Sequence, residues 1–189
     1  MRSTTTVLGT AVALALLAAS LAVGPALAEE RTCRGSLGAT TVDNLRVPAG
    51  ATCTLTGTKV KGTIKVERRA TLFAYGVRVI GNVQAENARK VIVARSSRIG
   101  GSVQVVQSGV AKVKNSRING VILFDENSGI NVARSNIVGA DIQAFQNDGG
   151  VRIYYNRIDG NLQCKANSPR PVGAGNIVGG VKQDQCRRF

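Results

Sequence analysis

The chain contains no histidine and no tryptophan, and its only methionine is the first residue. Without an imidazole it cannot build a Ser-His-Asp or Cys-His nucleophile, a histidine general base or a histidine-ligated zinc site. Aromatic residues are only 4% of the chain, so a stacking platform for sugars or bases would rest on Tyr75, Tyr154, Tyr155 or a few Phe. Acidic residues are also scarce, because 11 Asp and Glu stand against 25 Lys and Arg. These shortages exclude histidine-dependent catalysis and leave a strongly basic chain.

The first 28 residues have the pattern of a cleaved secretory signal peptide. A positive start at Met1-Arg2 precedes an apolar stretch over residues 7–23, and small residues at Ala26 and Ala28 precede the polar Glu29. We expect cleavage after Ala28, which leaves about 161 residues, the size of one ordinary domain. The mature chain would then carry 24 Lys and Arg against 11 Asp and Glu, a net charge of +13. No later stretch is long and apolar enough to span a bilayer, so the sequence predicts a secreted protein.

Four cysteines remain in the mature chain, an even number in a compartment that favours disulfides. Cys33 and Cys53 are 20 residues apart, and Cys164 and Cys186 are 22 apart, one pair near each end. A four-thiolate zinc site would need closer Cys spacing. Of the three possible connectivities, the local pairing of Cys33 with Cys53 and of Cys164 with Cys186 fits the repeat described next.

An internal repeat of the form V-x-G-x-I-x-V dominates the mature chain, with a first clear copy at residues 60–66 and a weak earlier one at 41–47. Its glycine column advances in steps of 19 or 20 and comprises Gly62, Gly81, Gly101, Gly120, Ala140, Gly160 and Gly180. Within the first copy, Val60, Ile64 and Val66 alternate with lysines, as in a half-buried strand. A second short apolar segment lies between copies, at residues 53–55, 71–73, 91–93, 110–113, 130–132 and 151–153. Each repeat is thus expected to form two short strands joined by turns.

This pattern predicts an all-β, single-stranded, right-handed parallel β-helix of about seven or eight short coils, each advancing about 4.8 Å. A β-sandwich or barrel would not repeat the same residue types at a fixed step, and a leucine-rich repeat would show Leu columns and a helical half. We expect residues 29–57 to form an N-terminal cap and first coil. Residues 58–189 would form the β-helix, with a C-terminal cap tied by a disulfide.

Two columns of small polar residues support stacked coils. One comprises Ser97, Ser116, Asn136, Asn156 and Asn176. The other comprises Asn87, Asn127, Asn147 and Asn167. Stacked Asn side chains can bond between coils and satisfy buried turn groups. With its short coils and Asn columns, the chain resembles the right-handed parallel β-helix superfamily of pectate-lyase-like solenoids over about residues 40–185. Residues 160–164 through Asn176 to Cys186 also resemble an uncharacterised family of small secreted bacterial proteins.

Outward positions form linear stripes in a solenoid. The position before each first apolar residue is basic in five copies, and these residues, named here the basic stripe, are Lys59, Arg78, Arg98, Arg117 and Arg157. Ile137 and Ile177 occupy the same position in the other copies. Stacked cations repel one another, so the stripe suggests a site for a linear polyanion. The alternative is that the alkyl chains of these Lys and Arg side chains cover neighbouring coils while their charged groups stay in solvent. A second outward column comprises Lys65, Gln84, Gln104, Leu123, Gln143, Gln163 and Gln183, which structure alone can explain.

The leading hypothesis is a non-catalytic, monomeric secreted protein that binds acidic polysaccharide or a cell-envelope polymer along the basic stripe. We expect no cofactor, metal or nucleic-acid partner. The enzyme alternative, a polysaccharide lyase or glycoside hydrolase, would place Asp141, Asp159 and Arg157 at its centre, because carboxylates on adjacent coils can act as a pair. Surface ion pairs are the simpler explanation for these three residues. The lyase family's calcium and arginine motifs are not recognisable, and the third alternative is an envelope protein without ligand.

Ice binding is a further reading of a small β-helix, and it needs a flat surface with regular Thr columns. Here the column that begins at Thr63 continues irregularly as Asn82, Ser102, Val121 and Asp141. The sequence therefore argues against an ice-binding face.

Overall fold

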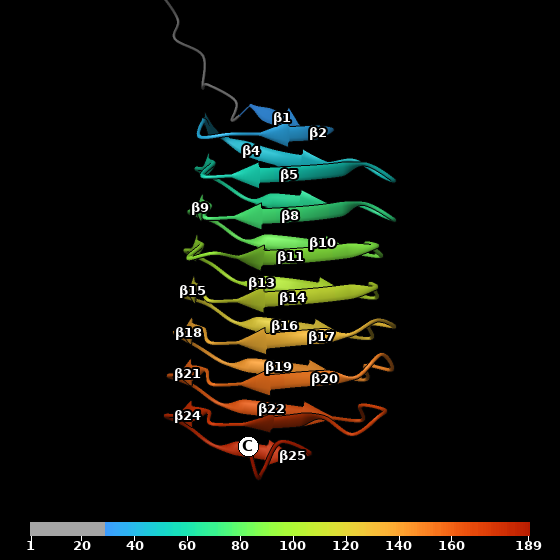
Figure 1. Cartoon of the computed structure of the whole chain (residues 1–189), viewed down its shortest axis with the longest axis vertical. Helices are drawn as coiled ribbons and strands as arrows, with labels where there is room; N and C mark the ends of the chain where they lie inside the picture. The colour runs from blue at the N-terminus through green and yellow to red at the C-terminus, as the bar shows by residue number, and fades with distance from the viewer. Residues whose placement is uncertain (1–28) are drawn as a thin grey trace, which may run out of the picture.

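The computed structural model describes residues 29–189, which form three parallel sheets wound into a solenoid (Figure 1). The expected signal peptide lies outside the described residues. The sheets are named A, B and C in the order in which the chain enters them. Each coil contributes one strand to each sheet, and eight complete coils are followed by a last strand of sheet A. None of the described residues is in a helix, and none forms a helix that could cross a membrane. The predicted all-β solenoid is confirmed.

The strands are short, from two to five residues each. Sheet A comprises β1 (Glu30–Thr32), β4 (Asn44–Val47), β7 (Ile64–Val66), β10 (Val83–Glu86), β13 (Val103–Val106), β16 (Ile122–Asp125), β19 (Ile142–Phe145), β22 (Leu162–Lys165) and β25 (Lys182–Asp184). Sheet B comprises β2 (Gly35–Leu37), β5 (Thr52–Thr56), β8 (Thr71–Tyr75), β11 (Lys90–Ala94), β14 (Val110–Lys114), β17 (Asn131–Arg134), β20 (Val151–Tyr154) and β23 (Val172–Ala174). Sheet C comprises β3 (Thr41–Val42), β6 (Lys59–Val60), β9 (Arg78–Val79), β12 (Arg98–Ile99), β15 (Arg117–Ile118), β18 (Ile137–Val138), β21 (Arg157–Ile158) and β24 (Ile177–Val178).

Each coil has three strands, and the prediction of two was wrong. The V-x-G-x-I-x-V unit turns a corner at its glycine, so Val60 belongs to sheet C whereas Ile64 and Val66 belong to sheet A. The alternation continues across that corner, and all three side chains are buried. The expected N-terminal region 29–57 already contains β1 to β5, which belong to the same three sheets as the later coils.

The core is a set of stacked aliphatic columns. In sheet A, for example, the inward residues Val105, Phe124 and Ala144 pair in register and are buried. Phe124 is the largest fully buried side chain among the described residues, and the small Ala144 is its partner on the next coil. One inward position is polar, because Asn131 of β17 is completely buried. The apolar segment predicted at 130–132 therefore faces the other way, with Ile130 and Val132 half-exposed.

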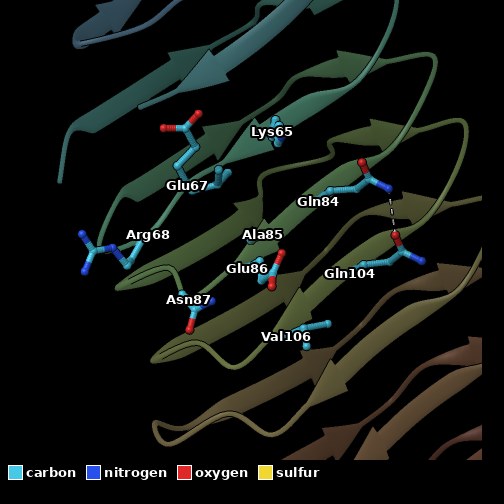
Figure 2. Close-up of a pocket in the computed structure, with 10 residues that line it drawn as sticks. Lys65, Glu67, Arg68, Gln84, Ala85, Glu86, Asn87, Gln104 and Val106 are labelled. Carbon is cyan, nitrogen blue, oxygen red and sulfur yellow. Dashed lines mark hydrogen bonds between the residues drawn. The ribbon is translucent and has the colours of Figure 1, made fainter. Parts of the chain in front are cut away.

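The outward glutamine column of sheet A is in register, as predicted. Gln84 donates to Gln104 over 3.1 Å (Figure 2), Gln143 donates to Gln163 over 3.0 Å, and Gln163 donates to Gln183 over 3.2 Å. These amide bonds run along the solenoid axis and tie neighbouring coils together outside the core.

Small polar side chains form a ladder inside the corner between sheets B and C, and its members match the predicted column. The Asn136 side chain donates to Asn156 Oδ1 over 2.9 Å, and the Asn156 side chain donates to Asn176 Oδ1 over 2.9 Å. The backbone amides of Asn136 and Asn156 donate to the same two oxygens, each over 3.0 Å. All three Asn are buried, and each also donates to a carbonyl of a preceding coil. The ladder thereby satisfies corner groups that would otherwise be buried without partners.

The corner between sheets A and B holds a second ladder, and here one predicted member was wrong. Asn127, Asn147 and Asn167 are buried and linked as expected. Asn87 instead points outward at a left-handed φ of 53°, a conformation that Asn tolerates well. The next residue, Ala88, takes the inward position, and its amide donates to Ser108 Oγ over 2.9 Å.

A third polar ladder, at the corner between sheets C and A, explains the glycine column. The Ser102 amide donates to Asn82 Oδ1 over 2.8 Å, and the Val121 amide donates to Ser102 Oγ over 3.0 Å. A Cβ atom added at Gly101 would come within 3.0 Å of the Asn82 side chain. Ala140 is the one exception in the column, and it follows the coil in which the ladder position is Val121, which has no side-chain acceptor. A side chain is therefore tolerated where the polar ladder is interrupted.

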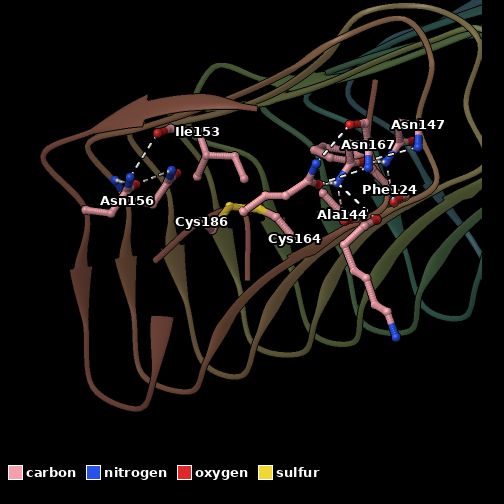
Figure 3. The surroundings of a disulfide bond; sticks show 11 residues. Phe124, Ala144, Asn147, Ile153, Asn156, Cys164, Asn167 and Cys186 are labelled. Atoms are coloured by element: carbon pink, nitrogen blue, oxygen red, sulfur yellow. Dashed lines mark hydrogen bonds between the residues drawn. A yellow bond between two sulfur atoms is a disulfide. The ribbon is translucent and has the colours of Figure 1, made fainter. Parts of the chain in front are cut away.

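The two cysteine pairs lie at disulfide distance near the two ends of the solenoid, and the predicted pairing is confirmed. Their Cα atoms are 5.6 Å apart for Cys33 and Cys53 and 5.3 Å apart for Cys164 and Cys186. Each disulfide joins neighbouring coils, and Cys164 and Cys186 lie between the two Asn ladders in Figure 3. Beyond Cys186, the half-buried Phe189 packs against the core at the C-terminal end.

Candidate functional site

Charge is divided unevenly among the three sheets. The acidic residues that lie in described strands are Glu30, Glu86, Asp125 and Asp184, all of sheet A. The strands of sheets B and C contain no Asp or Glu, whereas each of these sheets contains five Lys or Arg. Sheet A also neutralises part of its own positive charge, because Arg46 pairs with Glu30 at 2.8 Å and with Glu67 at 3.4 Å. Sheets B and C therefore present the basic surfaces.

The predicted basic stripe runs along sheet C. Strand pairing aligns Lys59 with Arg78, Arg78 with Arg98, and Arg98 with Arg117. These four side chains are exposed, and neighbouring strands of a sheet are about 4.8 Å apart. Among the described residues, none of the four forms an ion pair with a carboxylate. The stripe is thus an unneutralised row of cations over four consecutive coils.

A shallow groove of about 290 Å³ accompanies the stripe. Arg78, Arg98 and Arg117 line one side, and Ile80, Gly100 and Asn119 line the other. The exposed Ile137 interrupts the stripe in the next coil, and Arg157 follows after it. Arg157 differs from the other members because its Nε lies 3.8 Å from Asp159 Oδ1. The continuous part of the stripe therefore ends at Arg117.

The candidate catalytic carboxylates have different surroundings. Asp141 continues the ladder between sheets C and A, where its Oδ1 accepts from the Asn161 amide over 2.6 Å and from the Asn161 side chain over 3.3 Å. Asp159 is exposed beside Arg157. Neither aspartate lines the groove beside the basic stripe. The geometry therefore gives Asp141 a structural role and adds no support to the enzyme hypothesis.

Two other aspartates have shifted pKa values. The Lys61 ammonium, 2.9 Å from Asp43 Oδ1, donates a hydrogen bond that holds the pKa of Asp43 below its usual value. Burial, with a smaller effect from the Glu126 charge, raises the pKa of Asp125. Asp125 Oδ1 is buried and has no hydrogen-bond partner. Within residues 29–189, no three His, Cys, Asp or Glu side chains lie close enough together to hold a metal ion.

A larger hollow, of about 640 Å³, lies on sheet A (Figure 2). Its lining mixes both signs of charge with amides, since Lys65, Arg68, Glu67, Glu86 and Gln84 all contribute. Glu67 is already engaged, because its Oε2 accepts from the Ala49 amide over 3.0 Å. This mixed lining does not favour ligands of one charge.

Sequence reasoning missed the outer face of sheet B. In this sheet, strand pairing aligns the outward residues Phe73 and Ile92, and next to them Tyr75 and Ala94. Cations lie over three rings of this face and its edge, with Lys90 Nζ 5.9 Å from the Phe73 centroid, Arg95 Cζ 4.4 Å from that of Tyr75 and Arg134 Cζ 5.6 Å from that of Tyr155. Aligning the outward positions of the second apolar segment at the period of the repeat would have revealed this face.

Comparisons of the chain with protein-family models, with curated proteins and with solved structures find no match. The function is therefore inferred from the repeat, the three sheets and the distribution of charge.

Proposed function

We propose that the protein is a non-catalytic, secreted β-helix that binds an acidic polysaccharide or a cell-envelope polymer along the basic stripe. The observation that carries this proposal is the alignment of Lys59, Arg78, Arg98 and Arg117 on adjacent strands of sheet C, exposed and without carboxylate partners among the described residues.

The spacing of these cations suits a linear ligand. Charges of one sign at about 4.8 Å intervals repel one another, and a bound row of anions would relieve that repulsion. Guanidinium groups donate planar, paired hydrogen bonds to carboxylate, sulfate and phosphate groups. Ile80 and Gly100 line the other side of the adjoining groove, where they can make apolar contacts with the body of the polymer. One cation per coil therefore matches a polymer that carries acidic groups at regular intervals.

Two disulfides near the ends of the described chain fit an oxidising compartment, and they support secretion of the protein. The signal peptide would be cleaved after Ala28. The parallel coils and Asn ladders support membership of the right-handed parallel β-helix superfamily. Polysaccharides and envelope polymers are the abundant polyanions outside a cell, which is why they are favoured over nucleic acid as the ligand.

The test is a double charge reversal in the stripe, Arg78→Glu with Arg98→Glu. Binding to immobilised polygalacturonate should fall by at least about tenfold, because two attractive contacts become repulsive. The matched control is Lys65→Glu with Arg68→Glu, which changes the net charge equally at two exposed residues that line a hollow on sheet A. If both double variants lose the same affinity, or if the stripe variant binds as well as the parent, the proposal is wrong.

A further inference from the structure

A second group of unneutralised cations lies on sheet B, on a different face from the basic stripe. It is named here the cation cluster and comprises Lys112, Lys114, Arg134 and Arg152. Strand pairing aligns Lys114 with Arg134 directly, and it places Val132 between Lys112 and Arg152 in the next outward column. The four side chains come from three consecutive strands, β14, β17 and β20, so they crowd into a patch about 10 Å across.

The cluster surrounds a hollow of about 530 Å³. The hollow has apolar and aromatic walls, to which Ile130, Val132 and Tyr154 contribute. Lys112 and Lys114 are only half-exposed, so part of each side chain is held against its neighbours on this face. The site thus combines dense positive charge with a small patch suited to the face of a ring.

No carboxylate balances these cations. The strands of sheet B contain no Asp or Glu, and none of the four cations forms an ion pair among the described residues. Four like charges at this spacing repel one another, and a multiply charged anion would relieve that repulsion most effectively. A linear polymer with one charge per sugar would place fewer anionic groups within this patch than the four cations that the cluster contains.

We infer that the cation cluster is a binding site for a sugar that carries several phosphate or sulfate groups. The ester oxyanions lie between Lys112, Arg152 and the pair Lys114 and Arg134. The sugar ring packs against Val132 and Tyr154. The inference concerns sheet B only and does not depend on the basic stripe of sheet C.

Titration calorimetry of the disulfide-bonded protein with inositol hexakisphosphate and with sucrose octasulfate, at physiological salt, tests the inference. Replacing two members of the cluster, Lys112→Gln with Arg152→Gln, should weaken binding of at least one probe by about tenfold or more. A second variant, Val132→Glu, places a negative charge at the centre of the hollow and should abolish that binding. All three substituted positions point outward, and unchanged thermal unfolding would show that the fold is intact.

The matched control is Lys65→Gln with Arg68→Gln, which removes the same charge from two exposed residues beside the hollow on sheet A and should change affinity for these probes by less than about threefold. An equal loss in the control and cluster variants would overturn the inference, because binding would then follow net charge. It would also be overturned if neither probe bound the parent while vesicles of anionic phospholipid did, since the face would then recognise a lipid surface. Inorganic phosphate that competes as well as inositol hexakisphosphate at equal concentration would contradict a site for clustered esters.

Discussion

At the corner between sheets C and A, one side chain per coil decides which residue the next coil can accept. Asn82 Oδ1 receives the Ser102 amide and fills the space that a Cβ at Gly101 would need. The glycine column of the repeat is thus a consequence of the polar ladder, and positive φ is not its cause, because Gly101 has no left-handed conformation.

We predict that Gly101→Ala lowers the free energy of unfolding by about 2 kcal/mol, because the new methyl group displaces the Asn82 acceptor and leaves the Ser102 amide without its partner. Chemical denaturation of parent and variant measures the change. Gly38→Ala is the matched control, since a Cβ at Gly38 would meet nothing within 4 Å. Equal destabilisation by the two substitutions would contradict this explanation of the glycine column.

Asp125 provides a second residue-scale test, based on pH. Its pKa is raised in the folded protein, so folding favours the protonated carboxyl. The stabilising effect of that proton is present below the ordinary pKa of 3.8 and is lost as the pH rises through the folded pKa. We therefore expect Asp125→Asn to raise stability at pH 7 and to flatten the fall in stability above pH 3.8.

Thermal unfolding of the parent and Asp125→Asn between about pH 3 and pH 7 measures this effect. The exposed turn residue Asp148, substituted as Asp148→Asn, controls for the loss of one negative charge. A parent that gains stability over this range relative to Asp125→Asn would show that the carboxylate is favoured in the folded state and would contradict the assigned shift.

At the scale of the elements, the corner ladders join one coil to the next. Asn156 makes four such contacts, since its Oδ1 accepts from the Asn136 amide and side chain, and its Nδ2 donates to the Ala133 carbonyl and to Asn176 Oδ1. All of these groups lie in a corner where water does not reach Asn156. Strands of two residues, such as β18 and β21, contribute few backbone bonds, so the ladders carry much of the cohesion between coils.

We expect Asn156→Ala to lower the free energy of unfolding by about 3 kcal/mol, because it leaves several buried donors and acceptors without partners. Asn119→Ala is the matched control, since Asn119 is exposed and its side chain should contribute little. Denaturant titration of both variants gives the comparison. A loss below about 1 kcal/mol for Asn156→Ala would mean that the ladder is dispensable.

The sequence predicted the coils and the outward columns because residues that stack in register repeat at one period. It did not predict the corner between sheets C and A, because the buried residues Val60, Ile64 and Val66 stay an even number of positions apart through the glycine, as they would within one strand. Asn87 was misplaced because it lies one position before the inward residue Ala88, and varying coil lengths of 19 and 20 residues hid the offset.

The outer face of sheet B was missed for a related reason. Apolar side chains were taken to mark the core, whereas Phe73, Ile92 and Val132 are half-exposed on this face and Asn131 occupies the inward position. The burial of Asn131 is possible because it is hydrogen-bonded to Asn127, to the Gly129 carbonyl and to Asn147. The sequence of a single coil does not predict these bonds.

At the scale of the whole molecule, the solenoid separates its charges by face. Acidic residues in strands are confined to sheet A, so the Lys and Arg in the strands of sheets B and C have no acidic residue in the same sheet to balance them. One disulfide joins the first two coils, and the other joins β22 to the turn that follows β25. A solenoid with two cationic faces would suit a ligand that is long or densely charged.

The most direct test of the central claim is retention of the disulfide-bonded protein on immobilised polygalacturonate, dextran sulfate and neutral dextran, at low salt and at about 0.15 M salt. If the protein binds acidic polymers, it will be retained on them at low salt, less strongly as the salt concentration rises, and not at all on neutral dextran. Absence of retention on both acidic polymers at low salt would contradict it and would favour an envelope protein without ligand.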